Sequence, residues 1–395
     1  MRAGLLGRKL GHSLSPQIHK FFGDYEYRLY EKEPEEVESF LRTGFANGDF
    51  DFLNVTIPYK QTVFELCDEL SPTARKLGNV NFVTRTSDGK LKGDNTDAFG
   101  VGRLLDANGI DVRGWNCAIL GAGGAAMTVK AVLEERGAKR VTFVRRGEEP
   151  AQDDDLIVNA TPVGMFPDVD GVRVDILQHV ACKAVLDLVY NPSPTRLVRE
   201  ALACGKIAAD GMVMLIAQAY RASRLVPSAQ CLVPSAEGST LFLYGPPASG
   251  KSTWAKRIAA ATGWKLVDLD AEIVKTEGRS IPEIFEKEGE KGFREVEKRC
   301  LASICTGETP VPPKTSPPHE GRVVALGGGA LLDPESWKIA EAAGRVVVLE
   351  CPIETLKARI TGGDRPLSAD TAKLEALVNS RAAHYASFPR QVKML

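Results

Sequence analysis

The chain of 395 residues lacks the features that mark membrane or secreted proteins. No apolar run approaches the roughly 20 residues that a membrane-spanning helix needs. The opening stretch, MRAGLLGRKLGHS, lacks the long apolar region of a secretory signal, and the eight cysteines are scattered without a Cys-x-x-Cys pair. Scattered thiols argue against a disulfide framework and against a zinc site. We therefore expect a cytoplasmic protein with no membrane partner.

The chain also lacks an excess of charge of one sign and any internal repeat. Its 50 Lys and Arg residues balance 51 Asp and Glu residues, which leaves a formal net charge of −1. This balance excludes the basic field of a typical nucleic-acid-binding protein. What is present, 44% hydrophobic and 26% charged residues, is typical of a globular protein with packed cores. The length is too great for one typical domain and predicts two.

Short apolar runs alternate with helix-type segments along most of the chain. NCAIL, RVTFV, LIVNA and AVLDLVY form a first series of strand-like runs, and TLFLYG, KLVDLD, RVVAL and RVVVLE form a second. This alternation predicts parallel sheets with crossover helices, and therefore an α/β fold. Between the two series, residues 226–238 contain prolines and show weak periodicity, so we assign them as a linker.

The motif GAGGAA at 121–126 follows an apolar run and opens a helix-type segment. Its small residues let the backbone approach a pyrophosphate, which the helix N-terminus attracts. The next strand is followed by Arg145 and Arg146, where an NAD-binding protein usually places a carboxylate. Two guanidinium groups favour a 2′-phosphate and hence NADP, although a solvated basic turn remains an alternative. The predicted dinucleotide-binding loop comprises Gly121, Ala122, Gly123, Gly124 and Ala125.

Three motifs in the N-terminal part carry candidate catalytic and binding residues. GHSLSP places Ser13 and Ser15 on a turn where both hydroxyls can face one anion. NVTIPYK places Lys60 after a strand and a proline turn, and GDNTDAFG places Asp97 at a helix start. Taken singly, the same residues also fit structural roles as turn formers, a solvated lysine and an N-cap.

The order of GHSLSP, NVTIPYK, GNVN, GDNTD, GAGGAA, NATPVGM and DGMVMLIAQ resembles that of shikimate dehydrogenases, over residues 2–225. The resemblance implies a substrate-binding domain at 1–97 and a Rossmann-type NADP domain at 98–225. It also implies NADPH-dependent reduction of 3-dehydroshikimate to shikimate by the pair Lys60 and Asp97. The further residues that it implies as contacts of the substrate or the nicotinamide are Ser13, Ser15, Thr56, Asn81, Gln218, Tyr190 and Gly211.

The chain departs from this family in three places. Phe82 replaces a small polar residue, and RRG replaces the usual Asn-Arg-Thr after the second strand of the dinucleotide unit. The last helix, which normally follows the Gln218 segment and returns to the substrate domain, is short or missing. Two alternatives stay open. The substrate of this part could be quinate, or both quinate and shikimate; or this part could be a non-catalytic module that senses shikimate and regulates the C-terminal part of the chain. Retention of both Lys60 and Asp97 favours an enzyme.

A second nucleotide-type loop, GPPASGKS at 245–252, matches G-x-x-x-x-G-K-[ST] in full between a strand-type and a helix-type run. We predict that its backbone cradles phosphates, that Lys251 reaches the β- and γ-phosphates and that Ser252 binds Mg²⁺. LVDLD is interpreted as the end of a strand, with Asp268 and Asp270 on one face. The predicted ATP-contacting residues of the loop are Gly245, Ala248, Ser249, Gly250, Lys251, Ser252 and Thr253.

The pieces DLD, GEKGFREVE, GGG, RPL and R-x-x-x-Y resemble those of shikimate kinases, over residues 239–390. The resemblance implies a P-loop kinase domain at 239–395 that phosphorylates shikimate at its 3-hydroxyl group with ATP and Mg²⁺. It implies that Asp270 acts as general base, that Asp268 supports the metal and that Arg365 lies on a closing lid. The residues that it implies as shikimate contacts are Asp270, Arg294, Gly328, Gly329 and Arg381. Arg359 is implied to lie near the adenine. A proline-rich stretch at 306–322 predicts a surface loop.

Overall fold

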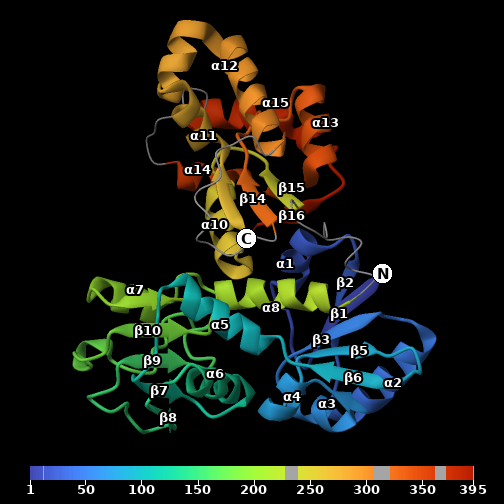
Figure 1. Cartoon of the computed structure of the whole chain (residues 1–395), viewed down its shortest axis with the longest axis vertical. Helices are drawn as coiled ribbons and strands as arrows, with labels where there is room; N and C mark the ends of the chain where they lie inside the picture. Colours follow the sequence, from blue (N-terminus) through green and yellow to red (C-terminus); the bar gives the residue numbers. More distant parts are fainter. Residues whose placement is uncertain (12, 227–238, 307–320, 361–370, 395) are drawn as a thin grey trace. The chain divides into compact units, whose positions relative to one another are not determined.

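The computed structural model describes residues 1–11, 13–226, 239–306, 321–360 and 371–394, and the chain divides into two compact units (Figure 1). The first is built mainly from the residues up to 226 and the second mainly from those after 238. The predicted linker from residue 227 onward, most of the proline-rich stretch and Arg365 lie outside the described residues. Among the helices described, none is both long and apolar enough to cross a membrane.

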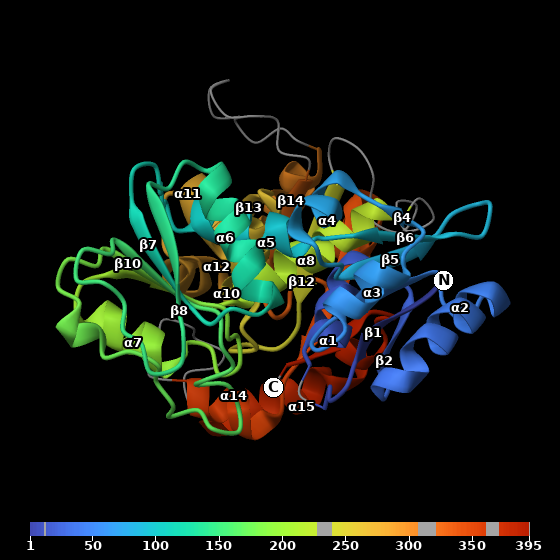
Figure 2. The same ribbon diagram turned by 90° about the horizontal axis from the view of Figure 1, so that it is seen from below.

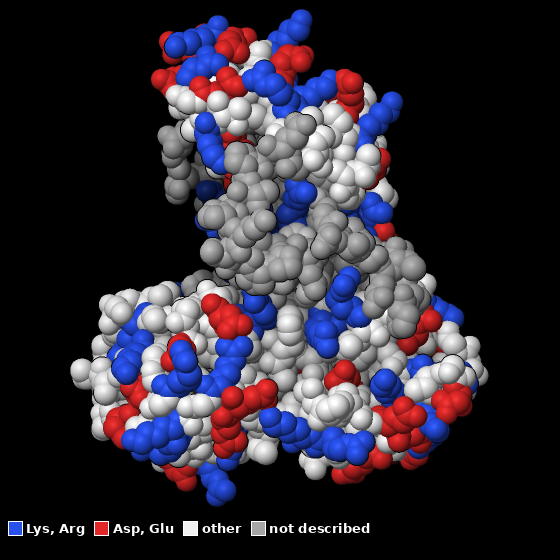
Figure 3. Space-filling model, viewed as in Figure 1, with Lys and Arg blue, Asp and Glu red and all other residues white. Residues whose placement is uncertain are grey.

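The charged side chains of the described residues are mixed in sign over the face of the molecule that Figure 3 shows. Lysines and arginines alternate with aspartates and glutamates within each unit, and no large area of one sign is visible on this face. This distribution agrees with the nearly equal numbers of basic and acidic residues in the sequence.

The first unit opens with a six-stranded mixed sheet in the order β2-β1-β3-β5-β6-β4. Strand β1 is parallel to β2 and β3, whereas β5 is antiparallel to β3 and β6. The strands are β1 Arg2–Gly7, β2 Glu26–Glu31, β3 Phe52–Val55, β4 Glu69–Leu70, β5 Phe82–Arg85 and β6 Leu91–Asp94. The helices are α1 Ser15–Phe22, η1 Pro34–Glu36, α2 Val37–Asn47, α3 Lys60–Leu66 and α4 Pro72–Leu77.

The remainder of the first unit is a five-stranded parallel sheet in the order β11-β10-β9-β7-β8. Figure 2 shows α5 and α6 on one side of this sheet and α7 on the other, and each side has its own apolar core. The strands are β7 Asn116–Leu120, β8 Arg140–Val144, β9 Leu156–Asn159, β10 Ala184–Asp187 and β11 Ile207–Ala209. The helices are α5 Asp97–Ala107, α6 Gly124–Glu135, η2 Ile176–Gln178, α7 Arg196–Ala203 and α8 Met212–Leu225. This is the predicted Rossmann-type arrangement.

Helix α8 contacts both parts of the first unit, although we expected the helix that returns to the substrate-binding part to be short or missing. It packs against α5 and also against α1 of the first sheet, where the ring centroids of Phe22 and Tyr220 lie 5.5 Å apart. Helix α8 therefore itself joins the dinucleotide-binding part to the substrate-binding part. The residues that follow it, 227–238, lie outside the described part of the chain.

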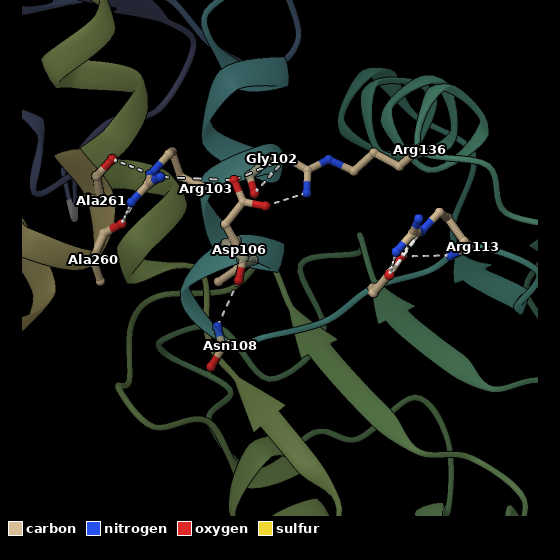
Figure 4. Close-up of polar contacts among 10 residues, drawn as sticks. Gly102, Arg103, Asp106, Asn108, Arg113, Arg136, Ala260 and Ala261 are labelled. Carbon is tan, nitrogen blue, oxygen red and sulfur yellow. Dashed lines mark hydrogen bonds and ion pairs between the residues drawn. The ribbon is translucent and has the colours of Figure 1, made fainter. Parts of the chain in front are cut away.

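The C-terminal end of α5 is fastened to α6, as Figure 4 shows. Arg136, which follows α6, donates to the carboxylate of Asp106 at 2.5 Å and to the carbonyl oxygen of Gly102 at 3.2 Å. Asn108 caps the same end, because its Nδ2 donates to the carbonyl oxygen of Leu104 at 2.8 Å. These contacts fix the far end of the helix whose first residue is Asp97.

The second unit is a five-stranded parallel sheet in the order β13-β14-β12-β15-β16. An apolar core covers one side of the sheet and includes Phe242, Phe293 and Leu301. The strands are β12 Ser239–Tyr244, β13 Lys265–Asp268, β14 Gly321–Ala325, β15 Gly344–Glu350 and β16 Gln391–Lys393. The helices are α10 Lys251–Thr262, α11 Leu269–Glu277, α12 Ile281–Thr306, α13 Pro334–Ala343, α14 Ile353–Arg359 and α15 Thr371–Ala386.

The prediction that Asp268 and Asp270 share one face of a strand is wrong. Strand β13 ends at Asp268, and Asp270 lies in the first turn of α11. The Asp268 carboxylate caps this helix, because it accepts from the backbone N–H groups of Asp270 at 3.1 Å and Ala271 at 3.4 Å. An aspartate at a strand end is a strong N-cap, and this capping ends the strand two residues early.

Candidate active sites

Lys60 and Asp97 form a partly buried ion pair in the first unit. Each begins a helix, α3 for Lys60 and α5 for Asp97, and Lys60 Nζ lies 2.6 Å from Asp97 Oδ2. Their side chains are only 16% and 8% exposed, so water screens the pair less than it screens a surface pair. A Cβ atom built on Gly124 would lie 3.9 Å from Lys60 Cδ, which places the lysine beside the start of α6. The pair therefore lies next to the glycine-rich loop.

Asn81 is hydrogen-bonded to the residue before Asp97, and Thr56 lies directly after strand β3. Asn81 Oδ1 accepts from the backbone N–H of Thr96 at 2.7 Å, and its Nδ2 donates to Thr96 Oγ1 at 3.1 Å. Thr56 follows β3, and its backbone N–H donates to the carbonyl oxygen of Leu6 at 2.9 Å. Asn81 is thus held beside the residue that precedes Asp97.

The two serines lie together at the start of α1. Ser13 Oγ donates to Ser15 Oγ at 3.1 Å and accepts from the Ser15 backbone N–H at 3.2 Å. Burial raises the pKa of the Tyr190 phenol, and a hydrogen bond with Ser13 partly offsets that rise. Burial likewise raises the pKa of the Tyr27 phenol, and a hydrogen bond with Ser15 partly offsets that rise. The structure therefore brings the predicted residues Ser13, Ser15 and Tyr190 together, and adds Tyr27.

Asn54, which the sequence motifs did not single out, is hydrogen-bonded to Gln218. Tyr27 donates through its hydroxyl to Asn54 Oδ1 at 2.9 Å, and Asn54 Nδ2 donates to Gln218 Oε1 at 3.3 Å. Gln218 Nε2 donates in turn to the carbonyl oxygen of Leu215 at 2.9 Å. Asn54 is 3% exposed, and its position at the start of NVTIPYK was the available signal.

A neutral histidine supports this network. The His19 ring stacks on Tyr27 with centroids 4.1 Å apart, and its Nδ1 lies 2.6 Å from the Tyr25 hydroxyl. Burial lowers the pKa of His19 to about 3. The ring is therefore uncharged at neutral pH and packs against the residues of the substrate side.

The glycine-rich loop connects β7 to α6 and is accessible at its tip. The register places Leu120 opposite Val144, and the Gly121 N–H donates to the Val144 carbonyl oxygen at 3.0 Å. Gly123 is the N-cap of α6, so the free N–H groups of the first turn lie at the loop, with Ala122 and Ala125 beside them. An exposed loop at a helix N-terminus fits a pyrophosphate.

Arg145 and Arg146 follow β8 beside this loop, and both are exposed. The Arg145 N–H donates to Glu148 Oε2 at 2.7 Å, so a carboxylate closes the turn. Arg173 holds the turn from the other side by donating to the carbonyl oxygens of Arg145 and Glu148. Both arginines thus follow β8, the last strand in the sheet order, and their residues are exposed.

A buried carboxylate fixes the segments that lead to Tyr190 and Gly211. Asp187 is 1% exposed and accepts from Asn159 Nδ2 at 2.8 Å and from Thr195 Oγ1 at 2.8 Å. Burial raises the pKa of Asp187 to about 6. The Gly211 N–H donates to the Val189 carbonyl oxygen at 3.0 Å, next to Tyr190.

The second loop, between β12 and α10, has the geometry of a phosphate cradle. Ala248 has φ 61, the one positive φ of a non-glycine residue in the described part of the chain, and Gly250 is the N-cap of α10. Ser249 is fully buried, and its hydroxyl has no hydrogen-bond partner among the residues described. Lys251 Nζ donates to the carbonyl oxygens of Gly245 at 2.9 Å and Pro246 at 2.7 Å. Strained backbone and an unsatisfied buried hydroxyl both fit a loop shaped for phosphates.

Ser252 and Asp268 supply the oxygen atoms that would hold Mg²⁺. Ser252 Oγ donates to Asp268 Oδ2 at 2.9 Å. In the part of the chain that the structure describes, no three His, Cys, Asp or Glu side chains form a metal-binding group. One hydroxyl and one carboxylate suit Mg²⁺, which commonly takes its other ligands from phosphates and water. Thr253 follows Ser252 on α10, and Arg359 Nη1 lies 3.5 Å from the Ala248 carbonyl oxygen.

Two arginines meet a glycine turn beside the phosphate loop. A Cβ atom on Gly329 would lie 2.5 Å from Arg294 Nη2, so only glycine lets the guanidinium lie there. Arg381, which is 8% exposed, donates to the Gly328 carbonyl oxygen at 3.1 Å. Asp270 borders the same turn, because a Cβ atom on Gly327 would lie 3.5 Å from its Oδ1. The predicted kinase residues Asp270, Arg294, Gly328, Gly329 and Arg381 therefore converge.

Glu297 is a further residue of this cluster that was missed in the sequence. It is 2% exposed, and its Oε2 lies 2.5 Å from Arg294 Nη1. Burial raises the pKa of Glu297 and outweighs the opposing effect of Arg294. Its place three residues after Arg294, on the same face of α12, was the available signal.

Comparisons with known proteins bear on both units. The family model "Shikimate dehydrogenase substrate binding domain" matches residues 5–83, and the model "Shikimate kinase" matches residues 247–393. A shikimate dehydrogenase (NADP(+)) of Clostridium beijerinckii is 36% identical over 247 residues, which cover 56% of this chain and 90% of the relative.

Two solved structures resemble the first unit. The shikimate 5-dehydrogenase of Thermus thermophilus in complex with NADP(H) and shikimate has a TM-score of 0.52 and 31% identity, covering 58% of this chain and 94% of that one. The quinate dehydrogenase of Corynebacterium glutamicum in complex with NAD has a TM-score of 0.51 and 30% identity, covering 58% and 94%. The chain therefore belongs to the shikimate dehydrogenase family and carries, in its second unit, a shikimate kinase domain.

Proposed function

We propose that this chain catalyses two consecutive reactions: NADPH-dependent reduction of 3-dehydroshikimate to shikimate, and ATP-dependent phosphorylation of shikimate at its 3-hydroxyl group. The observation that carries the proposal is that one chain holds both a Lys60–Asp97 pair beside a glycine-rich loop and a phosphate loop beside the Arg294 and Arg381 cluster. The product of the first site is the substrate of the second.

In the first reaction, Lys60 donates the proton to the carbonyl oxygen, and Asp97 orients the ammonium group at 2.6 Å. Ser13 and Ser15 hold the substrate carboxylate, and Gln218, whose amide is fixed by Asn54, meets a ring hydroxyl. NADPH, when bound at the glycine-rich loop, supplies the hydride. Both catalytic side chains are largely shielded from water, which strengthens their interaction with the developing charge.

In the second reaction, Arg294 and Arg381 hold the shikimate carboxylate, and Asp270 accepts the proton of the 3-hydroxyl group. Lys251 holds the β- and γ-phosphates, Ser252 would bind Mg²⁺, and Asp268, which accepts a hydrogen bond from Ser252, would support the metal through water. Mg²⁺, when bound there, offsets negative charge on the phosphates. Arg365 is proposed to stabilise the transferring phosphoryl group from the lid.

A second candidate for the first unit is quinate oxidation, because the quinate dehydrogenase noted above matches it as well as the shikimate enzymes do. Rates measured with shikimate and quinate, each with NADP and NAD, separate the two. We also infer a cytoplasmic location, which the seven free cysteines among the described residues support.

The test of the proposal follows both reactions in one sample containing 3-dehydroshikimate, NADPH, ATP and Mg²⁺. NADPH loss and ADP formation are recorded separately, in the parent chain and in Lys60→Ala and Lys251→Ala. Lys60→Ala should lose about 10²–10⁴-fold in reduction and keep the kinase rate with added shikimate, whereas Lys251→Ala should do the reverse. NADPH consumption by Lys60→Ala at the parent rate would remove Lys60 from the mechanism. A parent chain that binds NADPH without turnover would favour the sensing alternative.

A further inference from the structure

The buried segment 79–81 contacts the element that carries Lys60. It lies between α4 and β5, and Asn79, Val80 and Asn81 are 4%, 0% and 3% exposed. The Val80 N–H donates to the carbonyl oxygen of Lys60 at 2.9 Å. The backbone of this segment is therefore fixed to the first residue of α3.

The same segment contacts the element that carries Asp97. Asn95 Nδ2 donates to Asn79 Oδ1 at 2.6 Å, and Asn95 Oδ1 accepts from the Ala98 N–H at 3.2 Å. Ala98 lies in the first turn of α5, one residue after Asp97. The Asn79 amide is itself oriented, because its Nδ2 donates to the Leu77 carbonyl oxygen at 3.2 Å. Asn79 thereby fixes which way the Asn95 amide points, and so whether Asn95 can cap α5.

We propose that Asn79 is a positioning residue of the dehydrogenase site, which sets the separation of Lys60 and Asp97 through Asn95. Residues 79 and 80 connect the two helices: the Val80 N–H bonds to the first residue of α3, and the Asn79 side chain bonds to Asn95, which caps the start of α5. Neither residue contacts the reacting atoms. The inference rests on the proposed function, because it assumes that the Lys60–Asp97 pair transfers the proton.

Asn79→Ala removes the short 2.6 Å contact of the Asn95 amide and leaves only the longer one, 3.5 Å, to the backbone carbonyl oxygen of residue 79, so the amide can turn away from Ala98. The start of α5 would shift, and with it the 2.6 Å contact of the catalytic pair. Displacements of about 1 Å at a reacting group cost up to about 100-fold in rate. We expect kcat for reduction to fall about 10- to 100-fold in Asn79→Ala. KM for NADPH should stay at the parent value, because the glycine-rich loop is untouched.

The experiment uses the full chain and compares Asn79→Ala, Asn95→Ala and the double variant. A matched control is Asn108→Ala, which removes a cap of α5 at its other end (Figure 4). For each variant, kcat, KM for NADPH and the melting temperature are measured, and the kinase rate gives the concentration of active chain. Since the two asparagines act as one unit, the double variant should lose no more kcat than the worse single variant.

Three results would overturn the inference. The first is a kcat of Asn79→Ala equal to that of the parent, and the second is a loss of kcat in the double variant equal to the combined losses of the two single variants. The third is that Asn108→Ala, at the same loss of melting temperature, loses as much kcat as Asn79→Ala. If Asn79→Ala does not fold, Asn95→Ala removes the same hydrogen bond from its other end and carries the same expectation. Lys60→Ala is measured beside them. If Lys60→Ala keeps the parent rate, the proposed function fails; if it loses activity while Asn79→Ala does not, only the positioning role fails.

Discussion

Arg294→Ala should destabilise the kinase unit far more than the loss of one substrate contact would suggest. In the parent chain the Arg294 guanidinium lies 2.5 Å from the Glu297 carboxylate, and the two side chains are 25% and 3% exposed. Removing one partner of a buried ion pair costs about 3–5 kcal/mol, because the remaining charge is left unpaired. Since Arg294 is partly exposed, we take the lower end, about 3 kcal/mol, which corresponds to roughly 6–12 °C in melting temperature for a unit of this size.

The loss of stability in Arg294→Ala should depend on pH, and the direction of this dependence follows from the pKa of Glu297. Burial already raises the pKa of Glu297, and without Arg294 that pKa rises further. A carboxyl group whose folded pKa exceeds its unfolded value binds its proton more tightly when folded. Its stability contribution is therefore lost as pH rises from the unfolded pKa through the folded pKa. The deficit of Arg294→Ala relative to the parent should be full above the folded pKa of Glu297 in the variant and shrink as pH is lowered toward the unfolded pKa of a glutamate.

The assay is thermal unfolding of the full chain across that pH range, with Glu297→Gln and the double variant Arg294→Ala/Glu297→Gln as controls. The double variant should regain most of the stability lost in Arg294→Ala, because the unpaired buried carboxylate of Glu297 is gone. It should still bind shikimate poorly, since the guanidinium is absent. A deficit that does not change with pH, or a double variant no more stable than Arg294→Ala, would refute the reasoning.

Three further outcomes are expected. Arg381→Ala removes the contact of the guanidinium with the Gly328 carbonyl oxygen and its hydrogen bond with Tyr385. It should weaken shikimate binding by about 1.5–3 kcal/mol and leave ATP affinity unchanged; a fall in ATP affinity with shikimate binding unchanged would show that Arg381 does not bind the substrate. Arg146→Ala should reduce kcat/KM with NADPH by roughly one to two decades and Arg145→Ala should add to it, while NADH is little changed; equal losses with both cofactors would mean that the arginines support the fold. Fragments 1–230 and 236–395 should each fold and keep one activity, as circular dichroism and the two assays would show.

Several features of the site followed from local sequence patterns. Strand-like runs alternating with helix-type segments predicted parallel sheets, and both sheets with that pattern are fully parallel. The full phosphate-loop motif and the glycine-rich loop lie, as predicted, between a strand and a helix. These features are local, because a loop and its flanking elements are contiguous in the chain. The prediction failed where two local signals competed: alternation favoured a strand through Asp270, but the capping of α11 by Asp268 prevailed.

The sequence by itself determined the two nucleotide-type loops, the fold class and the identity of the charged residues at each site. Only the tertiary structure decided which residues support them. Asn54, Asn79 and Glu297 are ordinary polar residues until folding buries them against partners from other elements, and burial is what makes an unpaired polar group costly. Lys60 and Asp97 are 37 residues apart, and their 2.6 Å contact depends on the packing of α3 and α5 about the segment between them. No local pattern specifies such a distance, because it is set by contacts among elements that are remote in the chain.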